Sequence, residues 1–188
     1  MTFTEIYRDD YLLVINKPAG LPSQRTKAGE EGVYELLSAH EDYVGLHHRL
    51  DRRASGLMVL TVHRSANKAM ARAFRKHQVQ RVYVALCEGE VHNGRWDSDV
   101  DGKPARTDVL VIGPYGDGLT AIECRLHTGR THQIRIHAAM NGTPLAGDRT
   151  YGGDASRPWE RLGLHAGELS LRHPTTGEAM TWSVAPTW

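Results

Sequence analysis

The sequence has little of several features that would point to a particular class of protein. Only two of the 188 residues are cysteines, Cys87 and Cys124, which argues against a disulfide framework and predicts two reduced, buried thiols. No segment approaches the roughly 18 consecutive apolar residues of a membrane-spanning helix. The first residues also lack the basic and then apolar pattern of a signal peptide. We therefore expect a cytoplasmic protein with no membrane partner.

Metal-ligand motifs are also absent, although the chain has 11 histidines. There is no HExxH motif, and two cysteines are too few for a structural zinc site. His132 and His137 are five residues apart, so on a helix their side chains would point about 140° apart. We therefore predict no metal site and interpret His48 and His132 as hydrogen-bonding residues of a scaffold.

The composition is typical of one folded domain. Apolar residues make up 40% and charged residues 24% of the chain, which excludes a disordered protein. A chain of this length buries roughly 70% of its unfolded surface on folding. We expect a single domain over residues 1–188, with no repeat and no linker.

Positive charge is concentrated in one segment. The net charge of the chain is +1, but residues 47–81 hold nine basic side chains and one acidic one, a net charge of +8. A basic band of this kind attracts phosphates even when the whole protein is nearly neutral. The alternative is a solvated helix face that binds nothing.

Apolar periodicity and turn residues predict a mixed order of strands and helices, and hence an α+β protein. Asp9 and Asp10 separate two strand patterns and predict a hairpin. Ser65 is the predicted N-cap of a helix over residues 66–77, and Thr131 the cap of a helix that ends at Met140. The other predicted elements are a short helix at 33–40, strands at 57–62, 79–87 and 120–126, and a polar loop at 94–104.

One carboxylate is a candidate catalytic residue because of its neighbours. Asp51 precedes the buried strand pattern at 57–62, and Ser55 and Gly56 predict a tight loop between the two. Three arginines lie close to it in the sequence: Arg49, Arg52 and Arg53. The alternative is that Asp51 serves only as an ion-pair partner of one of these arginines.

The segment 48–57 (HRLDRRASGL) resembles the active-site signature of the RluA-type pseudouridine synthases. Further blocks resemble that family in the same order: residues 81–86 (RVYVAL), 128–137 (TGRTHQIRIH) and 147–152 (GDRTYG), with a similar tail over 164–186. Two positions depart from the family pattern, since Ala54 stands where threonine is usual and Arg81 where lysine is usual. Several ordered blocks over nearly the whole chain identify it as a member of this family.

The resemblance implies a fold and an activity. The family fold is α+β, with a bent, mostly antiparallel mixed sheet, flanking helices and a central RNA-binding cleft. Residues 1–188 match its catalytic domain alone, without the N-terminal RNA-binding domain of many relatives. The implied reaction isomerises uridine in ribosomal or transfer RNA: the bond between uracil N1 and ribose C1′ breaks, and the base rejoins through C5. This reaction requires no cofactor.

Three residues match the catalytic positions of the family. Asp51 is implied as the essential carboxylate, either a nucleophile or the base that removes a ribose proton, and the sequence leaves both routes open. Arg135 is expected to pair with Asp51 and to keep it ionised when a bound base excludes water. Tyr83 is expected to pack on the target uracil, although a tyrosine between valines is also common as a structural strand residue.

Further residues are expected to contact RNA. Arg49 is suited to fill the stack after the target base flips out. Arg52 and Arg53 are suited to meet phosphates. Spacings of three and four residues place four basic residues along one face of the helix predicted in this region: Arg64, Lys68, Arg72 and Arg75. The matching blocks add His48, Arg130, His132 and Ile134. We expect a monomer that acts on a stem-loop of RNA and does not bind DNA.

Two other functions stand as alternatives. The first is a non-catalytic RNA-binding or RNA-folding module with the same fold, against which the presence of Asp51, Tyr83 and Arg135 argues. The second is a hydrolase that uses Asp51 on another glycosidic bond, but no second acid/base carboxylate lies at an evident motif position.

Overall fold

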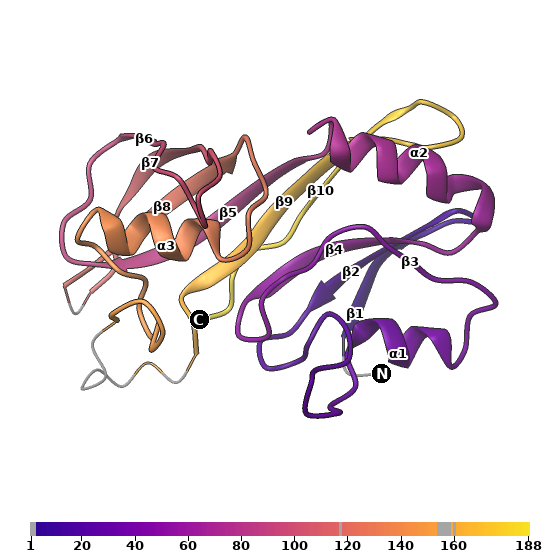
Figure 1. Ribbon diagram of the computed structural model, residues 1–188, viewed down its shortest axis with the longest axis horizontal. Helices are drawn as coiled ribbons and strands as arrows, with labels where there is room; N and C mark the ends of the chain where they lie inside the picture. Colours follow the sequence, from indigo (N-terminus) through magenta and orange to yellow (C-terminus); the bar gives the residue numbers. More distant parts are fainter. Residues whose placement is uncertain (1–2, 117, 154–158, 160) are drawn as a thin grey trace. The chain divides into compact units, whose positions relative to one another are not determined.

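The computed structural model describes residues 3–116, 118–153, 159 and 161–188. The chain forms two compact units. The first unit holds Met1–Gln80 and Ala166–Pro186, and the second holds Arg81–His165 and Thr187–Trp188. Each unit combines helices with strands that pair antiparallel (Figure 1). The predicted α+β class is therefore confirmed, and the expected single domain stays a prediction.

The first unit begins with the predicted hairpin. β1 (Thr4–Arg8) pairs antiparallel with β2 (Leu12–Lys17). Asp9 shapes the turn because its Oδ1 accepts the N–H groups of Tyr11 and Leu12, both at 2.7 Å. β2 also pairs antiparallel with β4 (Ser55–Thr61), whose seven residues are all buried. The continuous apolar run predicted this strand correctly.

The rest of the first unit surrounds β4. β3 (Gly45–Leu46) pairs with β4, and β9 (Leu164–Arg172) follows β4 in the strand order. β10 (Ala179–Ser183) pairs antiparallel with β9. The short predicted helix is α1 (Val33–Ser38). The loops that join β2 to α1 and β3 to β4 therefore belong to the same unit.

Helix α2 (Arg64–Arg75) buries Ala66 and Met70 and turns its basic side chains outward. Its N-cap is His63, so the prediction of Ser65 is wrong. The His63 ring reaches forward along the chain, and its Nδ1 accepts the N–H of Ser65 at 3.3 Å, which makes Ser65 part of the first turn. Met70 packs in the main core of the unit with Leu12, Val14, Leu57, Val59, Val79, Leu169 and Leu171.

The second unit contains four antiparallel strands in the order β5-β8-β7-β6. They are β5 (Gln80–Glu88), β8 (Leu119–Leu126), β7 (Thr107–Pro114) and β6 (Gly94–Trp96). The predicted loop over 94–104 is wrong at its start, because Trp96 is buried and its strand pairs with β7. The strand β7 was not predicted. Cys87 and Cys124 are free and buried as expected, and burial raises the pKa of Cys87 to about 12.

Helix α3 (Gln133–Met140) also lies in the second unit. Its N-cap is His132 in a left-handed conformation, with φ 56° and ψ 21°, so the prediction of Thr131 is wrong by one residue. The C-cap is Asn141, followed by Gly142 at φ 75°, which is the predicted end of the helix. The helix buries polar as well as apolar side chains, and these polar side chains position the site described next.

Candidate active site

Asp51 lies in the loop between β3 and β4, and hydrogen bonds fix the backbone of this loop. Ser23 Oγ donates to the carbonyl of Leu50 at 2.7 Å and accepts the N–H of the same residue at 2.9 Å. The N–H of Ala54 donates to the carbonyl of Asp51 at 3.1 Å, which closes a turn. The half-buried Asp51 carboxylate is therefore carried on a loop that neighbouring residues hold in place.

A buried lysine holds the residues that follow Asp51. Lys17 is 0% exposed. Its Nζ donates to four carbonyls, those of Pro18 (2.9 Å), Leu21 (2.7 Å), Ala54 (2.7 Å) and Arg52 (3.4 Å). A buried ammonium is stable only when such acceptors surround it. Lys17 thus joins the loop after β2 to the Asp51 loop, a role that the sequence analysis missed.

Backbone conformation and close packing explain why a glycine stands at position 56, after the Asp51 loop. Its φ is 113°, a conformation that residues with a Cβ rarely adopt. An added Cβ would lie 2.3 Å from the carbonyl oxygen of Ala166 in β9. Glycine therefore allows β4 and β9 to approach each other closely just beyond the candidate catalytic residue.

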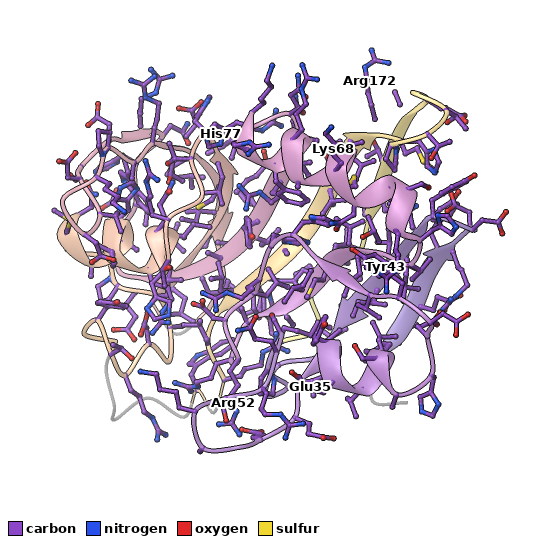
Figure 2. The ribbon with its side chains drawn as sticks, turned by 45° about the vertical axis from the view of Figure 1, so that its right-hand side comes forward. Glu35, Tyr43, Arg52, Lys68, His77 and Arg172 are labelled. Atoms are coloured by element: carbon purple, nitrogen blue, oxygen red, sulfur yellow. The ribbon has the colours of Figure 1, made fainter. Side chains whose placement is uncertain are left out.

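The arginines near Asp51 differ in their surroundings. Arg49 is exposed and makes no hydrogen bond or ion pair within the residues that the structure describes. Arg52, labelled in Figure 2, pairs with Glu30 at 2.9 Å, and the two side chains are 57% and 43% exposed. Arg53 is half-buried. The ion pair of Arg52 is therefore made with Glu30, and exposed pairs of this kind contribute only about 0–1 kcal/mol.

His48 supports the loop from inside the unit. It is 8% exposed, and its Nε2 accepts the N–H of Val59 in β4 at 3.0 Å. The acceptor role of Nε2 places the ring proton on Nδ1. The ring also stacks on Phe74 of α2, with the centroids 4.9 Å apart. The predicted scaffold role is therefore supported, and a direct contact of His48 with RNA stays a prediction.

The basic face predicted on α2 is exposed. The side chains of Lys68, Arg72 and Arg75 have no hydrogen-bond or ion-pair partner among the described residues, and Figure 2 labels Lys68 on this helix. Arg64 lies over the ring of Tyr43, 5.3 Å from its centroid. No acidic side chain in the described part of the chain forms an ion pair with this face, so its charges are open to an anionic partner.

In the second unit, Tyr83 lies on β5 opposite Cys124 of β8 and is 6% exposed. The burial of Tyr83 does not show whether its ring packs on uracil, so that contact stays a prediction. Arg81 precedes it by two residues and packs against Gly129, since a Cβ on Gly129 would lie 2.9 Å from the Arg81 Nη2. The arginine that departs from the family pattern thus contacts the block at 128–137.

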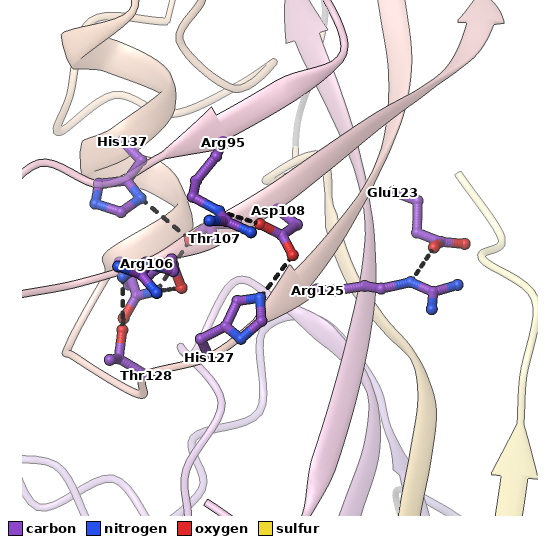
Figure 3. A network of polar contacts seen from close by, with 10 residues as sticks. Arg95, Arg106, Thr107, Asp108, Glu123, Arg125, His127, Thr128 and His137 are labelled. Atoms are coloured by element: carbon purple, nitrogen blue, oxygen red, sulfur yellow. Dashed lines mark hydrogen bonds and ion pairs between the residues drawn. The ribbon is translucent and has the colours of Figure 1, made fainter.

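Two buried polar residues fix α3 against β7. Gln133 is 3% exposed. Its Oε1 accepts hydrogen bonds from Thr128 Oγ1 (2.7 Å) and from the N–H of Arg130 (3.0 Å). Its Nε2 donates to the carbonyl of Arg106 (3.0 Å) and to Thr107 Oγ1 (2.9 Å). The hydroxyl of Thr107 then donates to His137 Nδ1 at 3.1 Å, so that His137 Nε2 carries the proton that is donated to the Ser98 carbonyl at 2.8 Å. Figure 3 shows the contact between Thr107 and His137.

Arg135 lies between Gln133 and His137 in α3 and is 8% exposed. Its Nε and Nη2 donate to the two oxygens of Asp148 at 2.7 and 2.8 Å. The guanidinium also lies over the ring of Tyr151, 4.9 Å from its centroid. Sequence analysis did not identify Asp148. The predicted pairing of Arg135 with Asp51 stays a prediction, since the two residues belong to different units.

Three other residues of the block at 128–137 were expected to contact RNA. Arg130 is exposed, and its Nε donates to the carbonyl of Pro104 at 3.2 Å. His132 is half-buried, and its Nδ1 lies 2.9 Å from the hydroxyl of Tyr151. Ile134 is 4% exposed and packs inside the unit. Of the three, Arg130 has the surface that an RNA contact requires.

An exposed polar network crosses β6, β7 and β8. Asp108 accepts from Arg95 Nε at 2.7 Å and from His127 Nε2 at 2.6 Å (Figure 3). These two bonds, with Arg95 the stronger influence, lower the pKa of Asp108 to about 2. Asp108 is therefore ionised at neutral pH and offsets part of the positive charge on this surface.

The described residues include no group of three or more histidine, cysteine, aspartate or glutamate side chains placed to hold a metal ion. Within the same residues, each helix is too short or too polar to cross a membrane.

Comparison with known proteins identifies the class to which this fold belongs. The family described as RNA pseudouridylate synthase matches residues 11–140. The chain is 32% identical to the dual-specificity RNA pseudouridine synthase RluA of Escherichia coli (strain K12), over 94% of this chain and 90% of the relative. It is 34% identical to the ribosomal large subunit pseudouridine synthase D of Nitrosomonas europaea, over 94% of this chain and 60% of the relative.

Solved structures agree with these sequence matches. Human RNA Pseudouridylate Synthase Domain Containing 1 superimposes with a TM-score of 0.79 at 25% identity, covering 98% of this chain and 83% of that one. The chain therefore belongs to the RNA pseudouridylate synthase family. It spans 60–65% of the length of several relatives, including the protein from Nitrosomonas europaea.

Proposed function

We propose that this protein is an RNA pseudouridine synthase that isomerises uridine in ribosomal RNA, transfer RNA or both. The observation that carries the proposal is the fixed loop of Asp51, which Ser23 and the buried Lys17 hold on both sides. Relatives named for action on the ribosomal large subunit, and one named as dual-specific, support the choice of substrate. We expect the protein to act in the cytoplasm without a cofactor.

The proposed reaction requires the target uridine to leave the stack, at a cost of a few kcal/mol. Arg49 is exposed, with no partner in the described residues, so its planar guanidinium is available to fill the vacated space. Among the described residues, the ion pair that Arg52 would give up on meeting a phosphate is the exposed one with Glu30. The exposed face of α2 supplies further positive charge for the backbone.

In the proposed chemistry, Asp51 acts on the ribose or the base while the bond from N1 to C1′ breaks, and the base turns so that C5 bonds to C1′. The proton displaced from C5 leaves to solvent, and N1, which has lost its bond to C1′, takes up a proton from solvent, so that the product is an isomer of uridine. Arg135 serves as the cation that keeps Asp51 ionised when the bound base excludes water. Tyr83 packs on the uracil and assists proton transfer at the isomerised base. Asp51 acts either as a nucleophile or as a base.

Release of tritium from RNA labelled at uracil C5 tests this proposal, because C5 loses its hydrogen when the new bond forms. The substrates are unmodified ribosomal and transfer RNA, and the enzymes are the wild type, Asp51→Ala and the control Asp42→Asn. Asp42 is an exposed carboxylate of the same unit. We expect release by the wild type and the control, without added metal, and none by Asp51→Ala. Tight RNA binding without release by the wild type would favour a non-catalytic RNA-binding module.

A further inference from the structure

A fully buried carboxylate next to α3 has no assigned part in the reaction. Asp148 is 0% exposed and binds the Arg135 guanidinium through both of its oxygens. We propose that Asp148 is a positioning residue, which sets the orientation of Arg135 before RNA binds. The proposal rests on the proposed function, in which Arg135 supports the Asp51 carboxylate.

Two kinds of contact fix the Arg135 guanidinium: hydrogen bonds along its edge and an aromatic ring over one of its faces. The two N–H donors of Arg135 that face Asp148 are Nε and Nη2, at 2.7 and 2.8 Å. Such a bidentate contact sets the rotation of the guanidinium plane. The ring of Tyr151 covers one face of that plane at 4.9 Å, and the Tyr151 hydroxyl is held by His132 Nδ1 at 2.9 Å. Rotation about the side-chain bonds of Arg135 would break these contacts together.

The backbone around Asp148 is equally constrained. Asp148 Oδ1 also accepts the N–H groups of Thr150 and Tyr151, at 3.1 and 3.3 Å. The preceding Gly147 has φ 68°, and an added Cβ there would lie 2.2 Å from the carbonyl oxygen of Arg161. The turn therefore presents the carboxylate in one direction and carries Tyr151 to its place over Arg135.

Electrostatics keeps Asp148 ionised in this buried site. Burial alone would raise the pKa of the carboxyl. The hydrogen bonds and positive charge of Arg135, together with the N–H groups of Thr150 and Tyr151, lower the pKa by more than burial raises it, so that it lies below its ordinary value. Loss of the carboxylate would remove the counter-charge that Asp148 supplies to the buried guanidinium. An arginine that loses such a partner regains its rotamer freedom, and a shift of about 1 Å in a catalytic group is enough to slow a reaction by about 100-fold.

Asp148→Asn separates this role from a purely structural one. The variant keeps the size of the side chain and one acceptor oxygen, but its amide N–H₂ group replaces the oxygen that accepts from Arg135 Nε. We expect kcat for pseudouridine formation to fall about 100-fold with KM changed less than about threefold. The matched control is Asp108→Asn, because Asp108 is a carboxylate of the same unit that also binds an arginine, Arg95, but is half-buried, with its side chain 35% exposed. We expect this control to keep its activity.

Chemical rescue gives a second readout that a structural role would not move. In Arg135→Ala, added guanidinium ion at millimolar concentration is expected to occupy the space beside Asp148 and Tyr151 and to restore part of kcat. In Arg135→Ala with Asp148→Asn the carboxylate is missing, and we expect no rescue. Rescue of both variants to the same extent, or an unchanged kcat in Asp148→Asn, would overturn the proposal.

The Nε–H signal of Arg135 in a ¹⁵N NMR spectrum decides the proposal even without turnover. It is identified by its absence in Arg135→Ala. We expect slow exchange of this proton with water in the free wild type and fast exchange in Asp148→Asn, and equal exchange in both would overturn the positioning role. Inactivity of the wild type on RNA would contradict the proposed function instead, and this spectrum would still test whether Asp148 fixes Arg135.

Discussion

The two units hold their candidate catalytic residues in different ways. In the first unit the contacts fix the backbone around Asp51: Ser23 binds Leu50, and Lys17 binds the carbonyls of the residues that follow. In the second unit the contacts fix the side chain of Arg135 itself, through the Asp148 carboxylate and the Tyr151 ring. In each unit, a candidate catalytic group is therefore held in position before the substrate binds, by a fixed loop in the first unit and by a fixed side chain in the second.

Removal of the buried lysine is expected to have the largest effect on the first unit. Lys17→Ala leaves four carbonyls without their shared donor and opens a cavity. We expect a loss of about 3 kcal/mol in the free energy of unfolding and loss of activity, since unsatisfied buried polar groups and cavities are among the most destabilising changes. Urea denaturation measures the first and tritium release the second. Lys27→Ala, at an exposed lysine, is the control, and equal effects in both would show that Lys17 does not hold the loop.

Arg49 lies on the same loop but has no partner in the described residues. Its replacement therefore tests contact with RNA rather than the stability of the loop. We expect Arg49→Ala to leave the free energy of unfolding unchanged within about 0.5 kcal/mol. Activity on a structured RNA should fall about 10-fold or more, because base flipping costs a few kcal/mol that the arginine no longer offsets. Activity on a short unstructured RNA should change less. Equal losses on both substrates would contradict a role in flipping.

The basic face of α2 predicts a smaller effect that depends on salt. If Lys68 and Arg72 each contact one phosphate, replacing both with alanine should reduce the slope of log affinity against log salt concentration by about 1.5 to 2. Filter binding over a range of salt concentrations measures this slope. Arg172→Ala removes an exposed arginine outside α2 and serves as the control (Figure 2). A slope unchanged in the double variant would show that this face is only solvated.

The hairpin turn of the first unit predicts the smallest effect, which is a change in pH dependence. Burial raises the pKa of Asp9, but hydrogen bonds from Tyr7 and from the N–H groups of Leu12 and Tyr11 lower it below its ordinary value. The stabilisation is therefore present above the unfolded-state pKa, about 3.9, and is lost as the pH falls through the lower folded-state pKa. Asp9→Asn should flatten the acid side of a stability-against-pH curve measured by urea unfolding. An unchanged acid slope would contradict this.

Local patterns allowed parts of this structure to be predicted from the sequence. The Asp9 turn, the apolar run of β4 and the end of α3 at Asn141 depend on residues within a few positions of each other. The N-caps of α2 and α3 were misplaced by one or two residues, since a histidine occupies each position. β7 has alternating burial from Thr107 to Val111, a period that was available in the sequence and was overlooked.

The contacts that support the site could not be predicted in the same way. Lys17 binds carbonyls 35 and 37 residues further along the chain, those of Arg52 and Ala54. Asp148 lies 13 residues beyond Arg135 and reaches it only because the chain turns back after α3. Sequence spacing carries no signal for either contact. The family blocks pointed to Arg135 and to the segment containing Asp148, but their pairing is a property of the folded unit.

The proposed pseudouridine synthase activity depends on the Asp51 carboxylate. Chromatography of the nucleosides from unmodified ribosomal and transfer RNA, after treatment with the wild type or with Asp51→Asn, tests this dependence. We expect pseudouridine with the wild type and none with Asp51→Asn, while the two proteins bind the RNA with equal affinity. Pseudouridine formed by Asp51→Asn at the wild-type rate would contradict it.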